Sequence, residues 1–283
     1  IISVYDNIVD YILVKQGAKI NAVGTPDKPI VMTSEKEEPG AWGGIHICGK
    51  AHTNAEGGKG SSEIGGAVYG GNDDADNSGT LQYIRLEYTG FAFDEEHEAN
   101  GISFYGVGNG TIVDHCEAYK GSDDGFEFFG GSVNVSNMVV VSCSDDSFDW
   151  TEGWNGKGTD LVAYQEAQAT LGYDCDCLIE ADNNENDNAA TPVSHPVLKN
   201  LILAGNGESK QGIRLRRGTQ ADIDNAKVCG KGQPLVVESA LTNAALKNGT
   251  SRLTNMTVTA ALKSDGDYTN DDFTAVTSNK VDA

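Results

Sequence analysis

Apolar residues recur along the chain in a fixed triplet, with members at positions x, x+3 and x+5. The last two members are two residues apart, which is the period of a β-strand with one buried face. The gap of three residues before them predicts a tight corner between two short strands. The copies are Leu81/Ile84/Leu86, Val113/Cys116/Ala118, Val135/Met138/Val140, Leu198/Leu201/Leu203, Ile223/Ala226/Val228 and Leu253/Met256/Val258.

The residue at x+2 lies in each predicted corner, and it is Asn in four of these six copies. Asn tolerates left-handed backbone geometry, and its amide can bond the copies above and below when coils stack. We therefore expect a ladder of corner side chains; the alternative is that Asn is simply common in turns. The corner residues are Tyr83, His115, Asn137, Asn200, Asn225 and Asn255.

A second repeat carries paired carboxylates. Residues 122–128 (SDDGFEF) and 144–150 (SDDSFDW) lie 22 residues apart, and a related copy, NGISFYG, occupies residues 100–106. Repetition at a period of about 20–50 residues is typical of a stacked solenoid. After each Asp pair, aromatic residues alternate with one acid, which predicts a strand with the rings on one face and the acid on the other.

The two repeats together predict an all-β fold: a single-stranded parallel β-helix with coils of about 22–24 residues and loop insertions. We interpret residues 1–283 as one elongated domain, and we expect only residues 238–247 to form a short helix. The end of the chain, residues 280–283, shows no evident cap. Because solenoids need capped ends, we expect the chain to be trimmed at both ends from a longer precursor.

Glycine-rich and Asp-rich turns give the chain a specific resemblance. They occur at residues 42–45 (WGGI), 70–79 (GGNDDADNSG), 100–102 (NGI), 123–131 (DDGFEFFGG) and 145–149 (DDSFD). Together these segments resemble a family of secreted bacterial proteins, many of them cell-surface lipoproteins, with right-handed parallel β-helices of the pectate-lyase-like superfamily. The resemblance covers residues 10–205 well and the remainder loosely. It implies the fold and an address outside the cell or at the outer cell surface, with any lipid anchor outside this chain, but it implies no reaction.

The formal charge of −22 argues against a general affinity for nucleic acid, whose phosphates need Lys and Arg. It favours a soluble extracellular protein and divalent cations; the alternative is that the acids merely maintain solubility. No apolar stretch approaches the ~18–20 residues that span a bilayer, so we expect no transmembrane segment. Cys175 and Cys177 flank Asp176 without a second Cys or His pair at zinc-like spacing, so we expect no metal–thiolate site there.

A candidate calcium loop begins at Asp74, and its proposed ligands are Asp74, Asp76 and Ser78. Oxygen side chains at alternating positions, followed by Gly79, match the first half of a calcium-binding loop. An EF-hand would need a bidentate Glu at position 12, where Arg85 stands. The alternative is an Asx-rich turn held by its own hydrogen bonds.

The stacked Asp pairs would repel one another, because carboxylates about 4.8 Å apart cost ~1 kcal/mol in water and more where water is excluded. Three kinds of relief are open: hydrogen bonds from turn amides, a bound cation, or a raised pKa that serves acid/base catalysis. If the protein is an enzyme, the catalytic candidates are Asp123, Asp124, Asp145 and Asp146. The His-Gly and Arg-x-Lys motifs of β-helix polysaccharide hydrolases are missing from the next coils, and no spacing argument brings Arg214 or Arg216 near the acids.

The function that we expect is noncatalytic binding of a glycan or another surface ligand. The outward acids would bond sugar hydroxyls or share a calcium ion with them, while exposed rings stack on sugar faces. The candidate ligand-binding residues are Glu127, Asp149, Tyr105, Phe129 and Trp154. The alternatives are a polysaccharide hydrolase or lyase that uses the stacked Asp pairs, and a structural stalk or adhesin segment.

Overall fold

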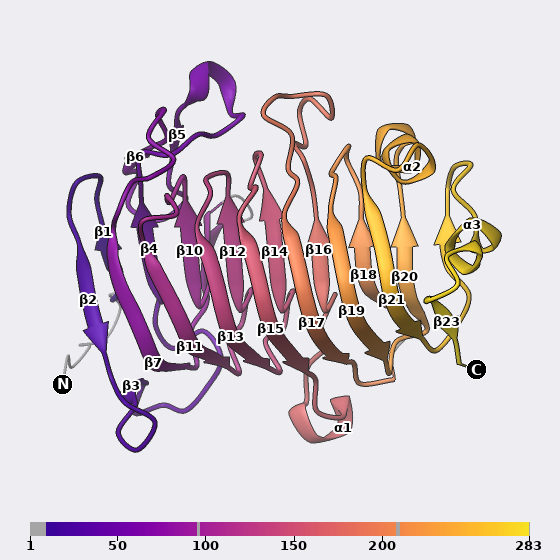
Figure 1. Ribbon diagram of the computed structural model, residues 1–283. Helices are drawn as coiled ribbons and strands as arrows, with labels where there is room; N and C mark the ends of the chain where they lie inside the picture. The colour runs from indigo at the N-terminus through magenta and orange to yellow at the C-terminus, as the bar shows by residue number, and fades with distance from the viewer. Residues whose placement is uncertain (1–9, 95–96, 208–209, 283) are drawn as a thin grey trace.

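The chain forms a parallel β-helix in the computed structural model, which describes residues 10–94, 97–207 and 210–282 (Figure 1). Two long parallel sheets run the length of the stack, and each coil contributes one strand to each sheet. The first sheet, called sheet A, contains β1 (Ile12–Val14), β4 (Ile45–Cys48), β10 (Ile102–Tyr105), β12 (Phe126–Phe129), β14 (Phe148–Thr151), β16 (Ile179–Ala181), β18 (Gln211–Leu215), β20 (Gln233–Val237) and β22 (Lys263–Ser264).

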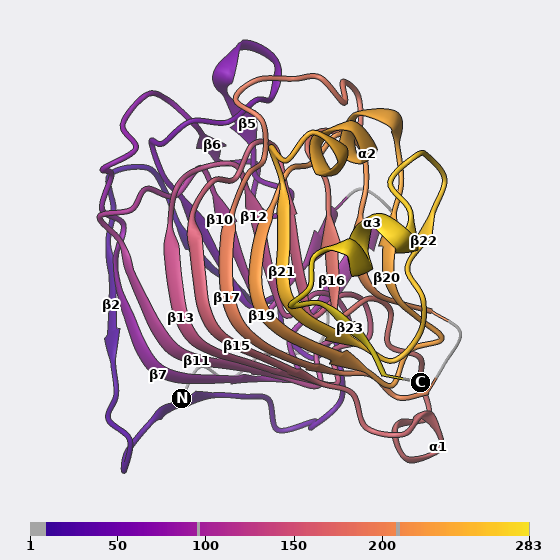
Figure 2. The same cartoon turned by 45° about the vertical axis from the view of Figure 1, so that its right-hand side comes forward.

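The second sheet, called sheet B, is made of longer strands that bend at the predicted corner. It contains β2 (Ile20–Val23), β7 (Gly79–Glu87), β11 (Ile112–Tyr119), β13 (Asn134–Val141), β15 (Lys157–Tyr164), β17 (Val197–Ala204), β19 (Asp222–Cys229), β21 (Arg252–Val258) and β23 (Lys280–Val281), with β3 (Ile30–Met32) paired to β7. Figure 2 shows these strands lying side by side, with each strand curved. The predicted parallel β-helix is therefore confirmed.

Every predicted corner residue has a positive φ, between 53° and 60°. The ladder is also present: the Asn225 side-chain amide donates to Asn200 Oδ1 at 2.8 Å, and that of Asn200 donates to Asp160 Oδ1 at 2.9 Å. Asp160 is a corner that the apolar triplet missed, because Gly158 takes the place of its first apolar member. Tyr83 and His115 instead stack their rings, with centroids 4.5 Å apart.

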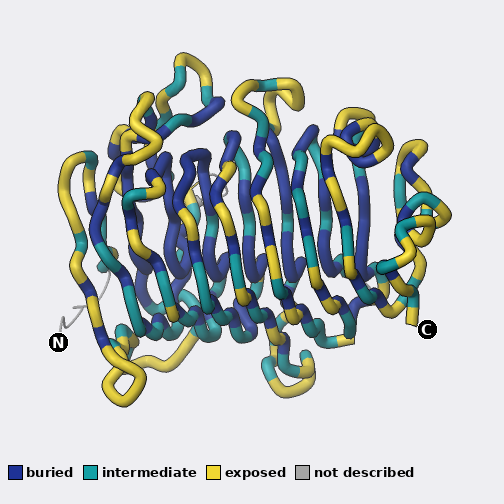
Figure 3. Tube along the Cα trace, viewed as in Figure 1, coloured by how far each residue is buried: buried dark blue, intermediate teal, exposed yellow. Residues whose placement is uncertain are grey.

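The core lies between the sheets, and buried residues recur from coil to coil along the whole stack (Figure 3). Rings from successive coils stack directly: the centroids of Phe104 and Phe128 are 5.0 Å apart, and those of Phe126 and Phe148 are 5.9 Å apart. Parallel stacking in register places like residues above one another, so each coil buries the face of the coil before it.

Insertions decorate the ends of the strands. They include two hairpins, β5 (Gly60–Ser61) with β6 (Val68–Tyr69) and β8 (Phe91–Asp94) with β9 (His97–Ala99), and the helices η1 (Glu56–Gly58), α1 (Gln168–Leu171), α2 (Ala240–Lys247) and α3 (Asn270–Ala275). The expected short helix corresponds to α2, whose N-cap Ser239 accepts a hydrogen bond from the Thr242 amide. No described helix is long and apolar enough to cross a membrane.

The expectation of a short helix only at residues 238–247 is wrong, because α1 and α3 are present as well, and trimming of the chain stays a prediction. Helix α3 lies at the C-terminal end of the stack (Figure 1), and its Phe273 is fully buried in the main core together with Tyr268 and Leu262. The sequence pattern hid α3 because a single buried ring on a six-residue helix has no repeat to reveal it.

Candidate functional site

The acids of the second repeat form a vertical column on the outward face of sheet A. Strand pairing places Glu127 opposite Asp149, Asp149 opposite Glu180, and Glu180 opposite Arg214. Ser103 precedes Glu127 in the same column. Because parallel strands lie about 4.8 Å apart, residues far apart in the sequence become direct neighbours.

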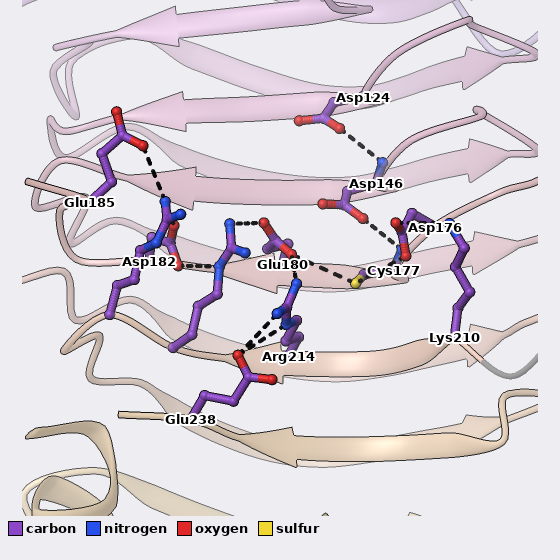
Figure 4. Close-up of polar contacts among 12 residues, drawn as sticks. Asp124, Asp146, Asp176, Cys177, Glu180, Asp182, Glu185, Lys210, Arg214 and Glu238 are labelled. Carbon is purple, nitrogen blue, oxygen red and sulfur yellow. Dashed lines mark hydrogen bonds and ion pairs between the residues drawn. The ribbon is translucent and has the colours of Figure 1, made fainter. Parts of the chain in front are cut away.

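A second column runs through the turns that lead into the same strands (Figure 4). Asp124 Oδ1 accepts a hydrogen bond of 2.8 Å from the Asp146 amide, and Asp146 Oδ1 accepts one of 2.6 Å from the Cys177 amide. The Asp124 amide in turn donates to Asp123 Oδ1 at 3.0 Å. Backbone amides of the turns therefore donate a hydrogen bond to one oxygen of each of these carboxylates. This is the first of the three ways in which we expected the repulsion between the Asp pairs to be relieved.

The two columns face a cavity of about 290 Å³. Its walls carry ten carboxylates, one amide, Asn100, and two guanidinium groups, Arg214 and Arg216. The acids come from the turns (Asp123, Asp124, Asp145, Asp146 and Asp176), from the strands (Glu127, Asp149 and Glu180) and from the two hairpin insertions (Glu63 and Glu98).

The basic side chains gather at one end of this cavity. Arg214 contacts Glu180 at 3.0 Å, and Arg216 pairs with Glu180 and, at 2.7 Å, with Asp182. Lys210 pairs with Asp176 at 3.0 Å. Ion pairs thus compensate the acids of β16 and its preceding turn.

The other end of the cavity has a different environment. Glu127 Oε2 accepts a hydrogen bond of 2.6 Å from the Asn100 side chain, and among the described lining residues no basic side chain comes from this end. Asp149 stands between the two ends, and its Oδ1 atom is fully buried without a hydrogen-bond partner. Fewer opposite charges therefore surround Asp124 and Glu127, whereas the charge of Arg216 still acts on Asp149.

Burial and mutual repulsion shift the pKa values of these acids upward. Burial raises the pKa of Asp123 to about 8, with further contributions from the charges of Glu98 and Asp145. Burial, followed by the charges of neighbouring acids, also holds the pKa values of Asp124 and Glu127 well above their usual range. Without cations, part of this cluster would retain protons near neutral pH.

Three groups of carboxylates are close enough to share an ion, with one oxygen from each member within 4.8 Å of the others. The groups are Asp123/Asp124/Asp145, Asp124/Glu127/Asp149 and Asp146/Asp149/Glu180. Asp124 belongs to two of them, and so does Asp149. Carboxylate oxygens at this spacing are the donor set that hard divalent cations prefer.

The family description "pectate-lyase like beta helix domain" matches residues 1–283. The chain belongs to this family. No curated protein and no solved structure matches the chain. The expected membership of the pectate-lyase-like superfamily is therefore confirmed at the level of the fold.

Three residues expected to present exposed rings in this pectate-lyase-like β-helix are buried instead. Trp154 packs in the main core, with its ring centroid 4.1 Å from that of Phe128. Tyr105 and Phe129 lie beneath the insertion formed by residues 49–78, in a small second core with Tyr69. The expectation of an exposed aromatic row is wrong, because two of its rings lie at strand ends that this insertion covers.

The candidate calcium loop is held by hydrogen bonds within the turn and by a contact from His52. Asp74 Oδ1 accepts a 2.7 Å hydrogen bond from the His52 ring, and Asp76 Oδ2 accepts one of 3.1 Å from the Ser78 hydroxyl. Among the described residues, the groupings with ion-binding geometry do not include these three. This arrangement matches the Asx-rich turn, and calcium at this loop stays a prediction.

The sequence missed much of the cavity of this pectate-lyase-like protein. Glu180 follows the same alternating pattern as Asp149, but an insertion carrying α1 separates the two coils and hides the period. Strand pairing also brings Arg214 next to Glu180, although no spacing argument joined the Arg residues to the acids. Glu63 and Glu98 come from hairpins outside the repeat, where no sequence signal identifies them.

Proposed function

We propose that the protein binds divalent cations, calcium first, in the acidic cavity, and through them holds an oxygen-rich ligand such as an acidic glycan. The observation that carries this proposal is the group Asp124/Glu127/Asp149, whose carboxylate oxygens lie within 4.8 Å of one another. A cation would relieve the repulsion among these carboxylates. It would also be coordinated by Asp149 Oδ1, which is buried and has no hydrogen-bond partner.

Calcium suits this cavity better than magnesium. Calcium accepts six to eight oxygens in irregular geometry, whereas magnesium demands a near-ideal octahedron and gives up its water reluctantly. The group Asp124/Glu127/Asp149 draws its oxygens from one turn and two strands, a set that suits irregular coordination. Calcium sites of extracellular modules work at about 10⁻⁴–10⁻³ M, which accords with the secreted or cell-surface location that we propose.

The glycan part of the proposal depends on the ions and not on stacked rings. A calcium ion held by three carboxylates keeps coordination positions that the hydroxyl or carboxylate oxygens of a sugar can fill. The cavity walls are polar throughout, and the rings nearest to it are buried, so we expect cation-mediated contacts to dominate. Membership of a pectate-lyase-like family supports association with a polysaccharide.

Calorimetric titration of metal-stripped protein with calcium tests the first step. We expect Glu127→Gln and Asp149→Asn to weaken calcium binding at least tenfold, because each removes a charged ligand. Asp267→Asn is the matched control: it makes the same acid-to-amide change at an exposed residue outside the cavity, and binding should stay as in the parent. The proposal is wrong if the parent gives no binding, or if the cavity variants bind as the parent does.

The second step is tested with the same variants. Oligogalacturonate, a soluble acidic glycan, should bind the parent protein in calcium and be released by a chelator. Binding that persists in the chelator, or that survives Glu127→Gln, would contradict a bridge through calcium.

One observation favours a second candidate, a polysaccharide hydrolase. The pKa of Asp123 is raised to about 8, so this carboxyl would carry a proton at neutral pH and could donate it to a glycosidic oxygen. Asp145, in the same group, would serve as the second carboxylate, because the charges of Lys210 and Arg216 favour its ionised form. Release of reducing ends from glycans by the parent, lost in Asp123→Asn with folding intact, would support this activity; binding without release would exclude it for the glycans tested.

A further inference from the structure

The turn column of acids ends at a cysteine. Cys177 occupies the position that Asp124 and Asp146 hold in the two preceding coils, and only 1% of its surface is exposed. Its Sγ lies 3.7 Å from Asp176 Oδ1 and 3.9 Å from Glu180 Oε1 (Figure 4). A neutral thiol has one hydrogen, so it can donate to one of these two carboxylates and leaves the other against an electron-rich sulfur.

Asp146 completes a group of three ligands. Asp146, Asp176 and Cys177 each place one ligand atom within 4.8 Å of the other two. Asp146 is 5% exposed, and the Cys177 amide fixes its Oδ1 at 2.6 Å. The second oxygen of Asp176 is held by Lys210 at 3.0 Å. Two carboxylates and one thiol are therefore oriented before any ion binds.

The separation of Cys177 and Asp176 matches a tetrahedral zinc site. With zinc–sulfur bonds of about 2.3 Å and zinc–oxygen bonds of about 2.0–2.2 Å, a tetrahedron places sulfur and oxygen about 3.6 Å apart. The observed distance of 3.7 Å between Cys177 Sγ and Asp176 Oδ1 is close to this value. Three protein ligands leave the fourth position to water or to an oxygen of a bound molecule.

A second feature, which this side of the cavity shares with the group Asp124/Glu127/Asp149, also favours a cation here. Asp149 Oδ1 is fully buried and has no hydrogen-bond partner, and it belongs to a group with Asp146 and Glu180, on the side of the cavity where Cys177 lies. Arg214 and Arg216 are engaged with Glu180, and in the part of the chain that the structure describes neither Asp146 nor Asp149 forms an ion pair. The charge of Arg216 acts on Asp149 only as a secondary influence, weaker than burial and the neighbouring acids. A positive ion beside Cys177 would face both Asp146 and Asp149.

We propose that Cys177, Asp146 and Asp176 form a second cation site, selective for zinc or a similar thiolate-binding divalent metal. It differs in chemistry from the all-oxygen groups around Glu127, because a thiolate selects softer metals than calcium. Binding replaces the S–H bond of Cys177 with a metal–sulfur bond and releases the thiol proton to solvent, so affinity should rise with pH. No oxidation or reduction is involved.

Cobalt is the probe that tests the site, because a thiolate bound to Co²⁺ gives a charge-transfer absorption in the near ultraviolet. We expect metal-stripped parent protein to bind one equivalent with this absorption, and zinc to abolish it by displacement. Cys177→Ser should lose the absorption, while Cys175→Ser, which changes a buried cysteine two residues away, should keep it.

The parent protein alone can overturn the proposal, so the test survives a variant that fails to fold. Absence of the charge-transfer absorption from the parent, or its persistence in Cys177→Ser, would show that Cys177 binds no metal. Asp176→Asn gives a further check: it removes a ligand and should weaken cobalt binding at least tenfold, and unchanged affinity would contradict the ligand set.

Discussion

The carboxylate of Asp124 accepts a hydrogen bond of 2.8 Å from the backbone amide of Asp146, one coil further along the helix. The same carboxylate belongs to two groups of acids that could share an ion. Asp124 therefore has a structural role as an acceptor for a turn amide and, in our proposal, a second role as a cation ligand. The two roles depend on different properties of the side chain, so substitutions can separate them.

Asp124→Asn should keep the first role and lose the second. An Asn oxygen can still accept from the Asp146 amide, while the buried negative charge disappears. In a chelator we expect an equal or higher melting temperature, and calorimetric calcium affinity should fall at least tenfold.

Asp124→Ala should fail in both roles. It leaves the Asp146 amide without its acceptor, which costs about 1–3 kcal/mol for a buried group. If Asn and Ala lower the melting temperature equally, the hydrogen bond contributes nothing measurable, and the structural role assigned to Asp124 is wrong.

Stability without metal should fall as pH rises. The pKa of Asp123 is raised to about 8 and that of Glu63 to about 7, against about 4 in an unfolded chain. The folded protein then holds more protons than the unfolded chain between about pH 4 and pH 8, so these groups stabilise fully below that window and lose their contribution through it. A loss of ~2 kcal/mol would lower the melting temperature by roughly 4–8 °C for a chain of this size.

Thermal melts in a chelator at about pH 5 and pH 8 measure this effect, and calcium should reduce it by replacing the lost protons. The matched variant is Asp123→Asn, which removes one of the two groups and should flatten the dependence. A melting temperature that is constant, or that rises with pH in the chelator, would mean that the acids are already hydrated or neutralised in the native state.

The sequence predicted the fold well because the fold itself is periodic. The corner position of the repeat identified Asn137, Asn200, Asn225 and Asn255, and each adopts the left-handed geometry that the pattern required. The vertical pairing of Glu127 with Asp149 was likewise predictable, because strands of equal length follow equal coils. In a solenoid, residues at the same position of successive repeats contact one another, so a repeat seen in the sequence also identifies contacts between coils.

The candidate site was predictable only where it lies on the repeat. Asp123, Asp124, Asp145 and Asp146 were identified, whereas Glu63 and Glu98 come from hairpins of individual sequence. Exposure was harder still: nothing in the pattern around Tyr105 shows that residues 49–78 fold over it. Because an insertion occurs only once in the sequence, comparison with other coils cannot predict where it lies in the structure.

The corner ladder gives a prediction about stability alone. Asn200 has a φ of 60°, donates to Asp160 and accepts from Asn225. Asn200→Ala loses both hydrogen bonds, which are exposed to solvent, and puts in left-handed geometry a residue whose side chain cannot hydrogen-bond locally. We therefore expect a cost of about 1–2 kcal/mol, mainly from the backbone. Asn200→Gly loses the same bonds but tolerates the backbone, and denaturant unfolding should find it the more stable of the two.

Equal stability of the two variants would show that the backbone geometry at this corner carries no cost. The same measurement on Asn225 offers a check, since its φ of 59° is nearly identical.

Trp154 distinguishes a core ring from a ligand-binding ring. It is 1% exposed, stacks on Phe128 and donates from its indole nitrogen to the Val133 carbonyl at 3.1 Å. Trp154→Ala should therefore cost about 3–5 kcal/mol in denaturant unfolding. Tyr164→Ala is the control, because that ring is 50% exposed on sheet B and its removal should change stability by less than ~1 kcal/mol.

Below its melting temperature the Trp154 variant should still bind calcium with parental affinity, because the ring lies in the core and contributes no atom to the cavity wall. A sugar platform would give the opposite result, with stability unchanged and oligogalacturonate binding lost. That outcome would mean that the ring becomes exposed in solution and that the cavity extends over the end of β14. Stacking of this ring on a sugar would then contribute to glycan binding.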